Sequence, residues 1–284
     1  MIKSYKLRRT LSNIFVYAVL LTLGLIWISP LVYLVLHSFR AEGLSTVSYL
    51  IPKEFSFDNY IKLFTDTATL DFPRWFLNTL VVAIFSCIIS TLAVLMVSYS
   101  FSRLRFKARK PLINIGMILG MFPGFMTMIA IYYLLKAMGL TQTLVALVIC
   151  YSAGAGLGYQ ISKGFFDTIP RALDEAATID GATRNQIFWK IILPMSKPIV
   201  VYTVLTSFIG PWTDFILAKI IMGDNRDNYT VAIGLQTMVS LEFKATYFRR
   251  FLAGSVIVAV PISILFLFMQ RYYVEGVTAG GVKG

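Results

Sequence analysis

The sequence predicts an all-α integral membrane protein with six transmembrane helices. Of its 284 residues, 57% are hydrophobic and only 14% are charged, whereas soluble domains are about 45–50% apolar and about 25% charged. The apolar residues are gathered in six long stretches with almost no charge, and a helix needs about 20 such residues to cross a bilayer. Because these stretches are continuous and do not alternate with polar residues, membrane-spanning strands are disfavoured.

The six stretches divide the chain into spans and loops within a single transmembrane domain, residues 1–284. The third and fourth stretches meet, so a tight turn over residues 136–141 must separate them. Prolines 30, 123, 211 and 261 lie within the stretches, and each is expected to kink its helix. The expected spans are residues 12–36, 76–101, 112–135, 140–162, 198–221 and 251–273, with a cytoplasmic loop at 163–197 and an outer loop at 222–250.

The first stretch has the basic start of a secretory signal peptide, which is the alternative interpretation. Its apolar run is about twice the length of a signal-peptide core, and no small-residue cleavage site follows at the right place. We therefore expect a retained first helix.

The basic residues predict the orientation of the chain. A net charge of +12 would also suit nucleic-acid binding, but the Lys and Arg residues are confined to short segments between apolar runs. The two termini and the segments 103–110 and 163–197 together carry sixteen Lys and Arg residues, and the intervening segments carry ten. Cytoplasmic loops are enriched in these residues. Both termini and both of these segments are therefore expected to face the cytoplasm.

Catalytic and metal-binding patterns are absent from the sequence. It has no Gly-rich P-loop for a nucleotide, and its two cysteines, Cys87 and Cys150, lie inside apolar runs. His37 is the single histidine. We therefore expect no catalytic residues, no metal site, no cofactor bound by this chain and no intramembrane enzyme.

Charged residues within the expected spans are scarce, and only Asp214 clearly lies inside one. An ion-coupled secondary carrier usually has several such residues, so this alternative function is disfavoured. Asp214 and the neighbouring Trp212 are candidates for the transport pathway. The other interpretation is that Asp214 is a hydrogen-bonded structural group near the membrane interface.

The segment 163–197 is long for a cytoplasmic loop and predicts two helices. Pro170 favours a helix start, and Asp174 and Glu175 follow near that helix N-terminus, where negative charge is stabilising. Gly181 can adopt the left-handed conformation that ends a helix. A second helix is expected to present one apolar face, formed by Ile187, Phe188, Ile191 and Ile192. A short helix is unstable alone in water, so the first either docks in a partner groove or belongs to an ordinary surface helix pair.

The segment from Glu175 to Ala182, EAATIDGA, followed by Phe188, Pro194 and Pro198, resembles the EAA motif of ABC importer permeases. The outer segment DNYTVAIGLQ and the C-terminal sequence VEGVTAGGVKG are similar to those of the carbohydrate group, and most similar to the second permease subunit of maltose/maltodextrin importers. The resemblance covers essentially the whole chain.

This resemblance implies a multi-pass permease subunit in a bacterial inner (plasma) membrane. Its implied partners are a second, different permease, a dimer of ATPase subunits and an extracytoplasmic sugar-binding protein. ATP and Mg would be used by the ATPase, and the imported sugar would be maltose, maltodextrin or a similar oligosaccharide. In the maltose-type family the other permease supplies most of the sugar site.

The resemblance also assigns residues to three contacts. The outer segment would touch the binding protein, the loop motif would couple to the ATPase, and the C-terminal tail would reach between the ATPase subunits. The binding-protein contacts would be Asp227, Asn228, Tyr229, Gly234 and Gln236. The coupling residues would be Glu175, Ala176, Ala177, Asp180, Gly181 and Ala182. The tail contacts would be Thr278, Ala279, Gly280, Gly281 and Lys283.

Overall fold

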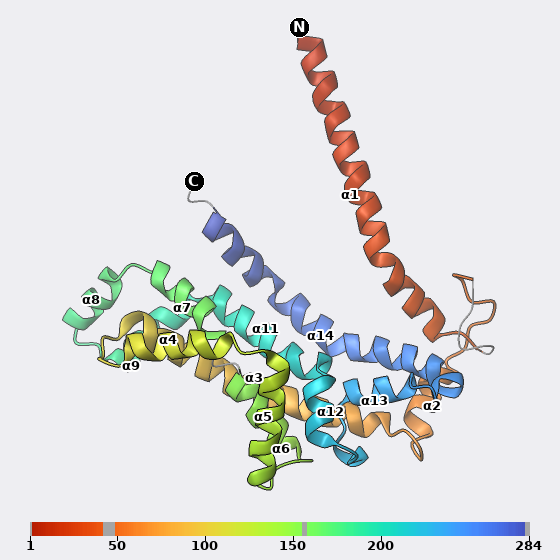
Figure 1. The fold of residues 1–284 in the computed structure, drawn as a ribbon. Helices are drawn as coiled ribbons and strands as arrows, with labels where there is room; N and C mark the ends of the chain where they lie inside the picture. Colours follow the sequence, from red (N-terminus) through yellow and green to blue (C-terminus); the bar gives the residue numbers. More distant parts are fainter. Residues whose placement is uncertain (1, 42–48, 155–157, 282–284) are drawn as a thin grey trace. The chain divides into compact units, whose positions relative to one another are not determined.

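The structure, a computed structural model, describes residues 2–41, 49–154 and 158–281, and most of these residues lie in helices (Figure 1). Among these residues the extended pairing is limited to one isolated bridge between Arg40 and Phe55. The chain forms two compact units: residues 1–70 with 237–257, and residues 71–236 with 258–284. We call them unit 1 and unit 2. The predicted all-α class is confirmed.

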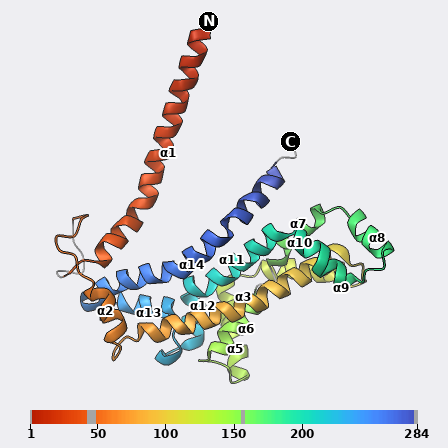
Figure 2. The same ribbon diagram turned by 180° about the vertical axis from the view of Figure 1, so that it is seen from behind.

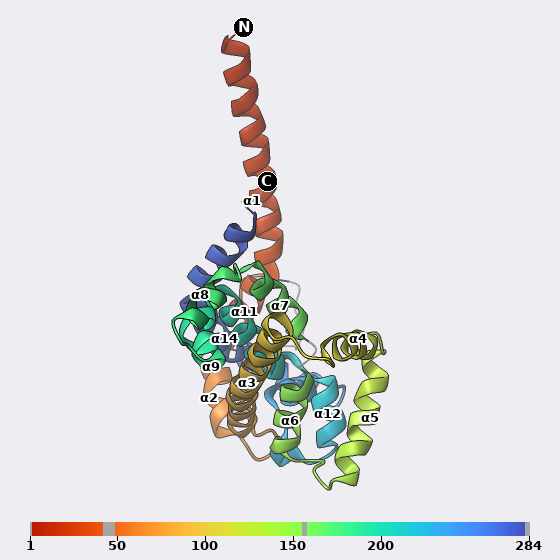
Figure 3. The same cartoon turned by 90° about the vertical axis from the view of Figure 1, so that its left-hand side faces the viewer.

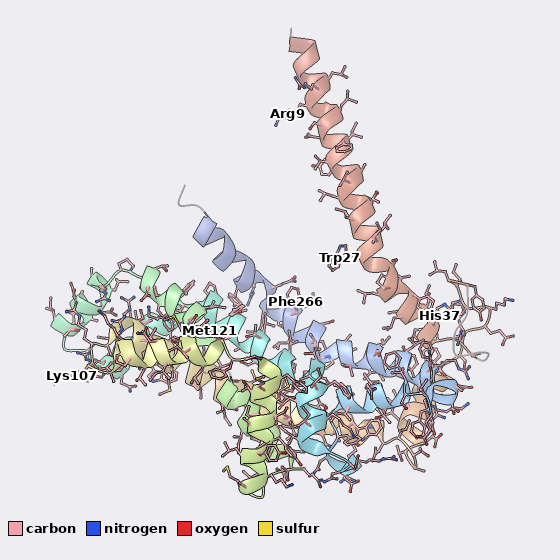
Figure 4. All side chains as sticks on the ribbon, in the orientation of Figure 1. Arg9, Trp27, His37, Lys107, Met121 and Phe266 are labelled. Atoms are coloured by element: carbon pink, nitrogen blue, oxygen red, sulfur yellow. The ribbon has the colours of Figure 1, made fainter. Side chains whose placement is uncertain are left out.

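Unit 1 contains the long helix α1 (Ile2–Ser38), the short helix α2 (Asp58–Thr65) and the beginning of α14 (Lys244–Gly281). The apolar side chains of α1 project away from the helix; Trp27, for example, is 79% exposed (Figure 4). A lipid or protein environment must cover such a surface, as expected for a membrane span.

Polar contacts hold the segment that follows α1 in unit 1. His37 is fully buried, and its Nε2 donates to the carbonyl oxygens of Tyr49 and Leu50 at 3.1 Å each. The Asn59 amide donates to the carbonyls of Ser38 and Arg40 at 2.9 and 2.8 Å. These bonds tie Tyr49, Leu50 and Asn59 to the end of α1 and the residues just after it.

Unit 2 is built around α3 (Phe72–Arg103), which packs against α11 (Lys197–Thr213), α7 (Tyr159–Thr168) and α6 (Leu144–Gly154). Figures 1 and 2 show α3 and α11 side by side. Asp71 caps α3 by accepting from the Arg74 backbone N–H. The buried face of α3 includes small polar residues such as Ser86 and Ser90, whose hydroxyls donate to carbonyls one turn earlier. Small, internally bonded side chains allow helices to approach closely.

The remaining helices of unit 2 are short. They are α4 (Arg109–Gly120), α5 (Gly124–Ala137), α8 (Ala172–Ile179), α9 (Arg184–Ile187), the π-helix η2 (Phe188–Ile192), α10 (Leu193–Met195), α12 (Ile216–Met222) and the 3₁₀ helix η3 (Arg226–Asn228). Helix α13 (Val231–Met238) begins in unit 2 and ends in unit 1.

Three helices are long and apolar enough to cross a membrane, and six spans result if each of three bent helix pairs counts as one. The expected third span is not one continuous helix, because α4 and α5 meet at 104°. Pro123 lies at this break; it lacks a backbone N–H and disfavours helical geometry in the residue before it. Met121, which marks the corner in Figure 4, is 83% exposed.

The expected fifth span is also interrupted. Helix α11 ends at Thr213, Asp214 has extended backbone geometry, and α12 begins at Ile216. By contrast, Pro30 and Pro261 lie inside the uninterrupted helices α1 and α14. The tight turn expected between the third and fourth stretches lies between α5 and α6, where Gly139 and Gln142 have positive φ angles of 68° and 64°.

Candidate functional site: the α8 loop and the outer segment

Helix α8 carries the loop motif and presents most of it to solvent. Glu175 and Ala176 are exposed, and Ile179 is 86% exposed, whereas Ala177 is buried. The predicted helix start is corrected by two residues, because Pro170 precedes α8 and its carbonyl accepts from the Leu173 N–H. The exposed face of α8 combines a carboxylate with small and apolar side chains, which suits contact with another protein.

A left-handed turn ends α8. Gly181 has a φ of +83°, and the Ala182 N–H donates to the Ala177 carbonyl at 2.9 Å. The N–H groups of Asp180 and Gly181 also donate to carbonyls of the last helical turn. Glycine adopts this geometry without steric penalty. The sequence therefore predicted the end of α8 and its cause correctly.

A capping box begins the helix that follows. The Thr183 hydroxyl accepts from the Gln186 N–H at 3.3 Å, and the Gln186 side chain accepts from the Thr183 N–H at 2.7 Å. Each side chain thus satisfies a backbone donor that the helix itself cannot. Figure 3 shows α8 and α9 next to each other, joined by this turn.

The α8 loop packs on an apolar core. The second predicted helix is a composite of α9, η2 and α10, and its expected apolar face is buried except for half-buried Ile191. Tyr99 of α3 packs against Phe188 with ring centroids 4.8 Å apart. The core consists of Leu95, Tyr99, Phe166, Ile169, Ala177, Ile187, Phe188, Ile192 and Ile199. It joins the loop to α3, α7 and α11.

An ion pair fixes the beginning of α8. Arg103 Nη1 lies 3.0 Å from Asp174 Oδ2, and the two side chains are 5% and 21% exposed. Arg103 Nη2 also donates to the carbonyls of Phe166 and Ile169 at 2.8 Å each. We call this set of contacts the Arg103 junction. This junction was not predicted from the sequence, in which Arg103 belongs to a basic segment that indicates only the orientation of the chain.

A groove of about 550 Å³ lies between the end of α3 and α8. Half of its lining residues are charged, and Arg103 and Asp174 are among them. The other charged residues that line it are Arg105, Arg171, Glu175 and Arg184. Among the charged residues beside α8, basic side chains therefore outnumber acidic ones.

The outer segment is fastened to the beginning of α3. Asp227 is exposed and pairs with Arg74 at 2.8 Å. The Asn78 amide donates to the carbonyls of Asp227 and Tyr229. The Asn228 amide, half-buried, donates to the Gln142 carbonyl at 2.7 Å. The polar end of α3 thus sets the path of this segment.

Two residues expected at the binding-protein contact lie inside the unit. Tyr229 is 4% exposed, and its hydroxyl accepts from Lys219 at 2.6 Å. Gly234 lies against the indole ring of Trp75 so closely that a Cβ atom would overlap the ring. Gln236, by contrast, is exposed. Tyr229 and Gly234 can therefore fix the conformation of this segment through their buried contacts, while Asp227 and Gln236 lie at its surface.

The intramembrane candidates Asp214 and Trp212 have different surroundings. Asp214 Oδ2 accepts from the Tyr151 hydroxyl at 3.0 Å, and Oδ1 accepts from the Leu217 N–H at the start of α12. Trp212 is buried between Phe76 and Phe208, and among the described residues its Nε1 has no hydrogen-bond partner. The contacts of Asp214 are those of a hydrogen-bonded structural group.

A cavity of about 300 Å³ lies beside these residues, between α3, α6, α7 and α11. Tyr151, which binds Asp214, lines it together with Pro211 of α11. Its other polar lining residues are hydroxyl-bearing and include Ser162, Tyr202 and Thr203.

The C-terminal candidates lie at the end of α14. The backbone of Thr278, Ala279, Gly280 and Gly281 is helical, and Lys283 lies outside the described residues. Within the described residues, no three His, Cys, Asp or Glu side chains are grouped in a way that could hold a metal ion.

Comparison with known proteins identifies the family. The family of binding-protein-dependent transport system inner membrane components matches this chain over residues 89–278. The matched residues include the whole α8 loop. The chain belongs to this family. The predicted resemblance to importer permeases of the carbohydrate group is confirmed, and the chain is a multi-pass membrane transport protein.

The relatives match the permease over its full length. The galactooligosaccharides transport system permease protein of Bacillus subtilis (strain 168) is 34% identical over 285 residues, covering 100% of both chains. The maltodextrin transport system permease protein of Streptococcus pneumoniae (strain ATCC BAA-255 / R6) is 34% identical over 284 residues, covering 99% of both.

A solved structure shares the fold of the permease. It is a chain of a bacterial ABC transporter involved in the import of the acidic polysaccharide alginate, with a TM-score of 0.76 and 22% identity. The match covers 91% of this chain and 95% of that one.

Proposed function

We propose that the permease is one of two different membrane subunits of an ATP-driven importer for an oligosaccharide such as maltodextrin. The observation that carries this proposal is the full-length similarity to permeases of galactooligosaccharide and maltodextrin transport systems. The exposed helix α8, with Glu175 on its free face, supports it. The chain would form six spans, have both termini in the cytoplasm and contain no ATPase site of its own.

In this proposal, α8 is the contact with the ATPase subunits. Glu175 would offer its carboxylate to a basic group of the ATPase, and the small side chains of Ala176 and Ala182 would permit close approach. The turn at Gly181 orients the helix, because its left-handed geometry sets the direction in which the chain leaves α8. ATP and Mg would bind only to the ATPase, whose closure would move α8.

An extracytoplasmic binding protein would deliver the sugar to the outer segment. Asp227, Asn228 and Gln236 would make contact, while Tyr229 and Gly234 would hold the segment in shape. Trp212 and Asp214 would lie beside the pathway. Thr278, Ala279, Gly280, Gly281 and Lys283 would reach the ATPase dimer.

The whole proposal is tested by copurifying the permease with its partners and measuring ATP hydrolysis with a panel of sugars. The expected result is a complex containing a second permease and an ATPase, whose hydrolysis rises with one class of oligosaccharide and the binding protein. Ion-gradient-driven uptake by the chain alone would contradict the proposal and favour a secondary carrier.

Coupling to the ATPase is tested by Glu175→Ala in α8 and by deletion of residues 278–284 in the C-terminal tail. Loss of one charge-assisted contact costs about 1.5–3 kcal/mol, so Glu175→Ala should give a partial loss of sugar-stimulated hydrolysis and uptake. The tail deletion should give a larger loss. Lys107→Gln, in the loop between α3 and α4, is the control for surface charge. Unchanged uptake and hydrolysis in both test variants would show that the proposed contacts are wrong.

A further inference from the structure

The Arg103 junction connects three segments that are separate in the sequence. Arg103 is the last residue of α3, its Nη2 binds carbonyls at the end of α7 and just beyond it, and its Nη1 pairs with Asp174 in the first turn of α8. The preceding residue adds a second link, since the Ser102 hydroxyl donates to Asp167 Oδ1 at 2.6 Å. One guanidinium thus holds the beginning of α8 to the end of α3.

The burial of Arg103 makes Asp174 essential to this arrangement. The Arg103 side chain is only 5% exposed, and within the described residues its Nε has no hydrogen-bond partner. Asp174 supplies the anion that compensates the buried charge; the other charged residues lining the groove are Arg105, Arg171, Arg184 and exposed Glu175. Removing one member of a buried ion pair leaves an uncompensated charge, which is strongly destabilising.

The junction connects α8 to the central helix of unit 2, α3. This helix packs against α6, α7 and α11 and forms the centre of unit 2. A force applied to the exposed face of α8 therefore reaches the centre of the helix bundle through the Arg103–Asp174 pair as well as through the apolar core below Ala177.

We propose that Arg103 is a positioning residue for energy coupling. Its ion pair with Asp174 makes α8 and the inner end of α3 move as one body, so that displacement of α8 by an ATPase displaces α3. This inference rests on the proposed function, and it concerns a contact within the chain, distinct from the contact that Glu175 would make with the ATPase.

The test uses the complete importer in proteoliposomes, with the binding protein and maltotriose as the probe sugar. Asp174→Asn removes the charge with little change in size, and Asp174→Glu keeps the carboxylate. Asp66→Asn is the matched control, because Asp66 forms a 2.8 Å ion pair with Arg250 and both residues belong to unit 1, whereas the α8 loop belongs to unit 2. The measurement is sugar imported per ATP hydrolysed.

Asp174→Asn should lower this ratio about tenfold, as expected for loss of one charge-assisted contact, while Asp174→Glu and Asp66→Asn should keep it. A merely structural role would reduce the amount of active complex and leave the ratio unchanged. An unchanged ratio in Asp174→Asn overturns the inference. If the wild-type complex itself imports none of the sugars in a panel, the proposed function fails instead.

A distance measurement tests the rigid link directly. Spin labels at Met96 of α3 and Ile179 of α8, both exposed, should give one narrow distance distribution that is the same with and without ATP. Asp174→Asn should broaden it. Equal distributions in wild type and Asp174→Asn would contradict the inference. If Asp174→Asn does not assemble, recovery of assembly by Asp174→Glu supports the role of the charge, and failure of Asp174→Glu overturns it.

Discussion

Single residues in this permease show how a local contact can have a large structural effect. Arg103 is the clearest case, since one side chain binds two carbonyl groups and one carboxylate. Trp75 is a second case. Its indole N–H donates to the Arg226 carbonyl at 3.2 Å, and its ring lies against Gly234. Both residues hold a segment of unit 2 to α3, one at each end of that helix.

The contact between Trp75 and Gly234 predicts a specific loss of stability. Gly234→Ala would place a methyl group inside the Trp75 ring, so the segment must shift. We expect the free energy of unfolding to fall by about 1–3 kcal/mol, the usual cost of overpacking, measured as a lower thermal midpoint of the purified complex. Gly164→Ala is the control, because nothing lies within 4 Å of its added methyl group. An equal midpoint for both variants would contradict the packing.

The helices of the α8 loop are short, so the contacts at their ends contribute more to their stability than their lengths do. Helix α8 has eight residues, too few to be stable alone in water. It is held by the Arg103–Asp174 pair at its beginning, by the buried side chain of Ala177 and by the left-handed turn at Gly181. Tertiary contacts, rather than helix propensity, therefore determine its position.

The turn at Gly181 gives a prediction for α8 as an element. Gly181→Ala would force a side chain into the left-handed region, which costs about 1–2 kcal/mol. We expect α8 to lose its orientation, and copurification of the ATPase subunits to fall several-fold. Gly181→Asn should retain more of the ATPase, because asparagine tolerates this geometry better. Equal retention in the two variants would show that the turn does not orient α8.

The whole molecule combines a hydrophobic exterior with basic segments on one expected side of the membrane. The exposed apolar side chains of α1, α4 and α5 need lipid or protein neighbours. The predicted orientation places residue 105 in the cytoplasm and residue 224 outside. Both of these residues are exposed, which makes them suitable labelling sites.

Thiol labelling tests this orientation. In a background with Cys87 and Cys150 replaced by alanine, an impermeant maleimide should label Asp224→Cys in intact spheroplasts. It should label Arg105→Cys only after the membrane is permeabilised. The reverse pattern would show that the topology is inverted, because only the side of the membrane decides access to two exposed residues.

The sequence by itself determined the helical class, the apolar stretches, the turn at Gly181 and the resemblance of the α8 loop, because these depend on local composition and on residues close together in the chain. Tertiary structure decided which residues that are distant in the sequence contact each other. It interrupted the fifth stretch at Asp214, buried Tyr229 and Gly234, and brought Arg103 to Asp174. Burial and ion pairing across some seventy residues of chain depend on how helices pack, and hydrophobic periodicity carries no information about that packing.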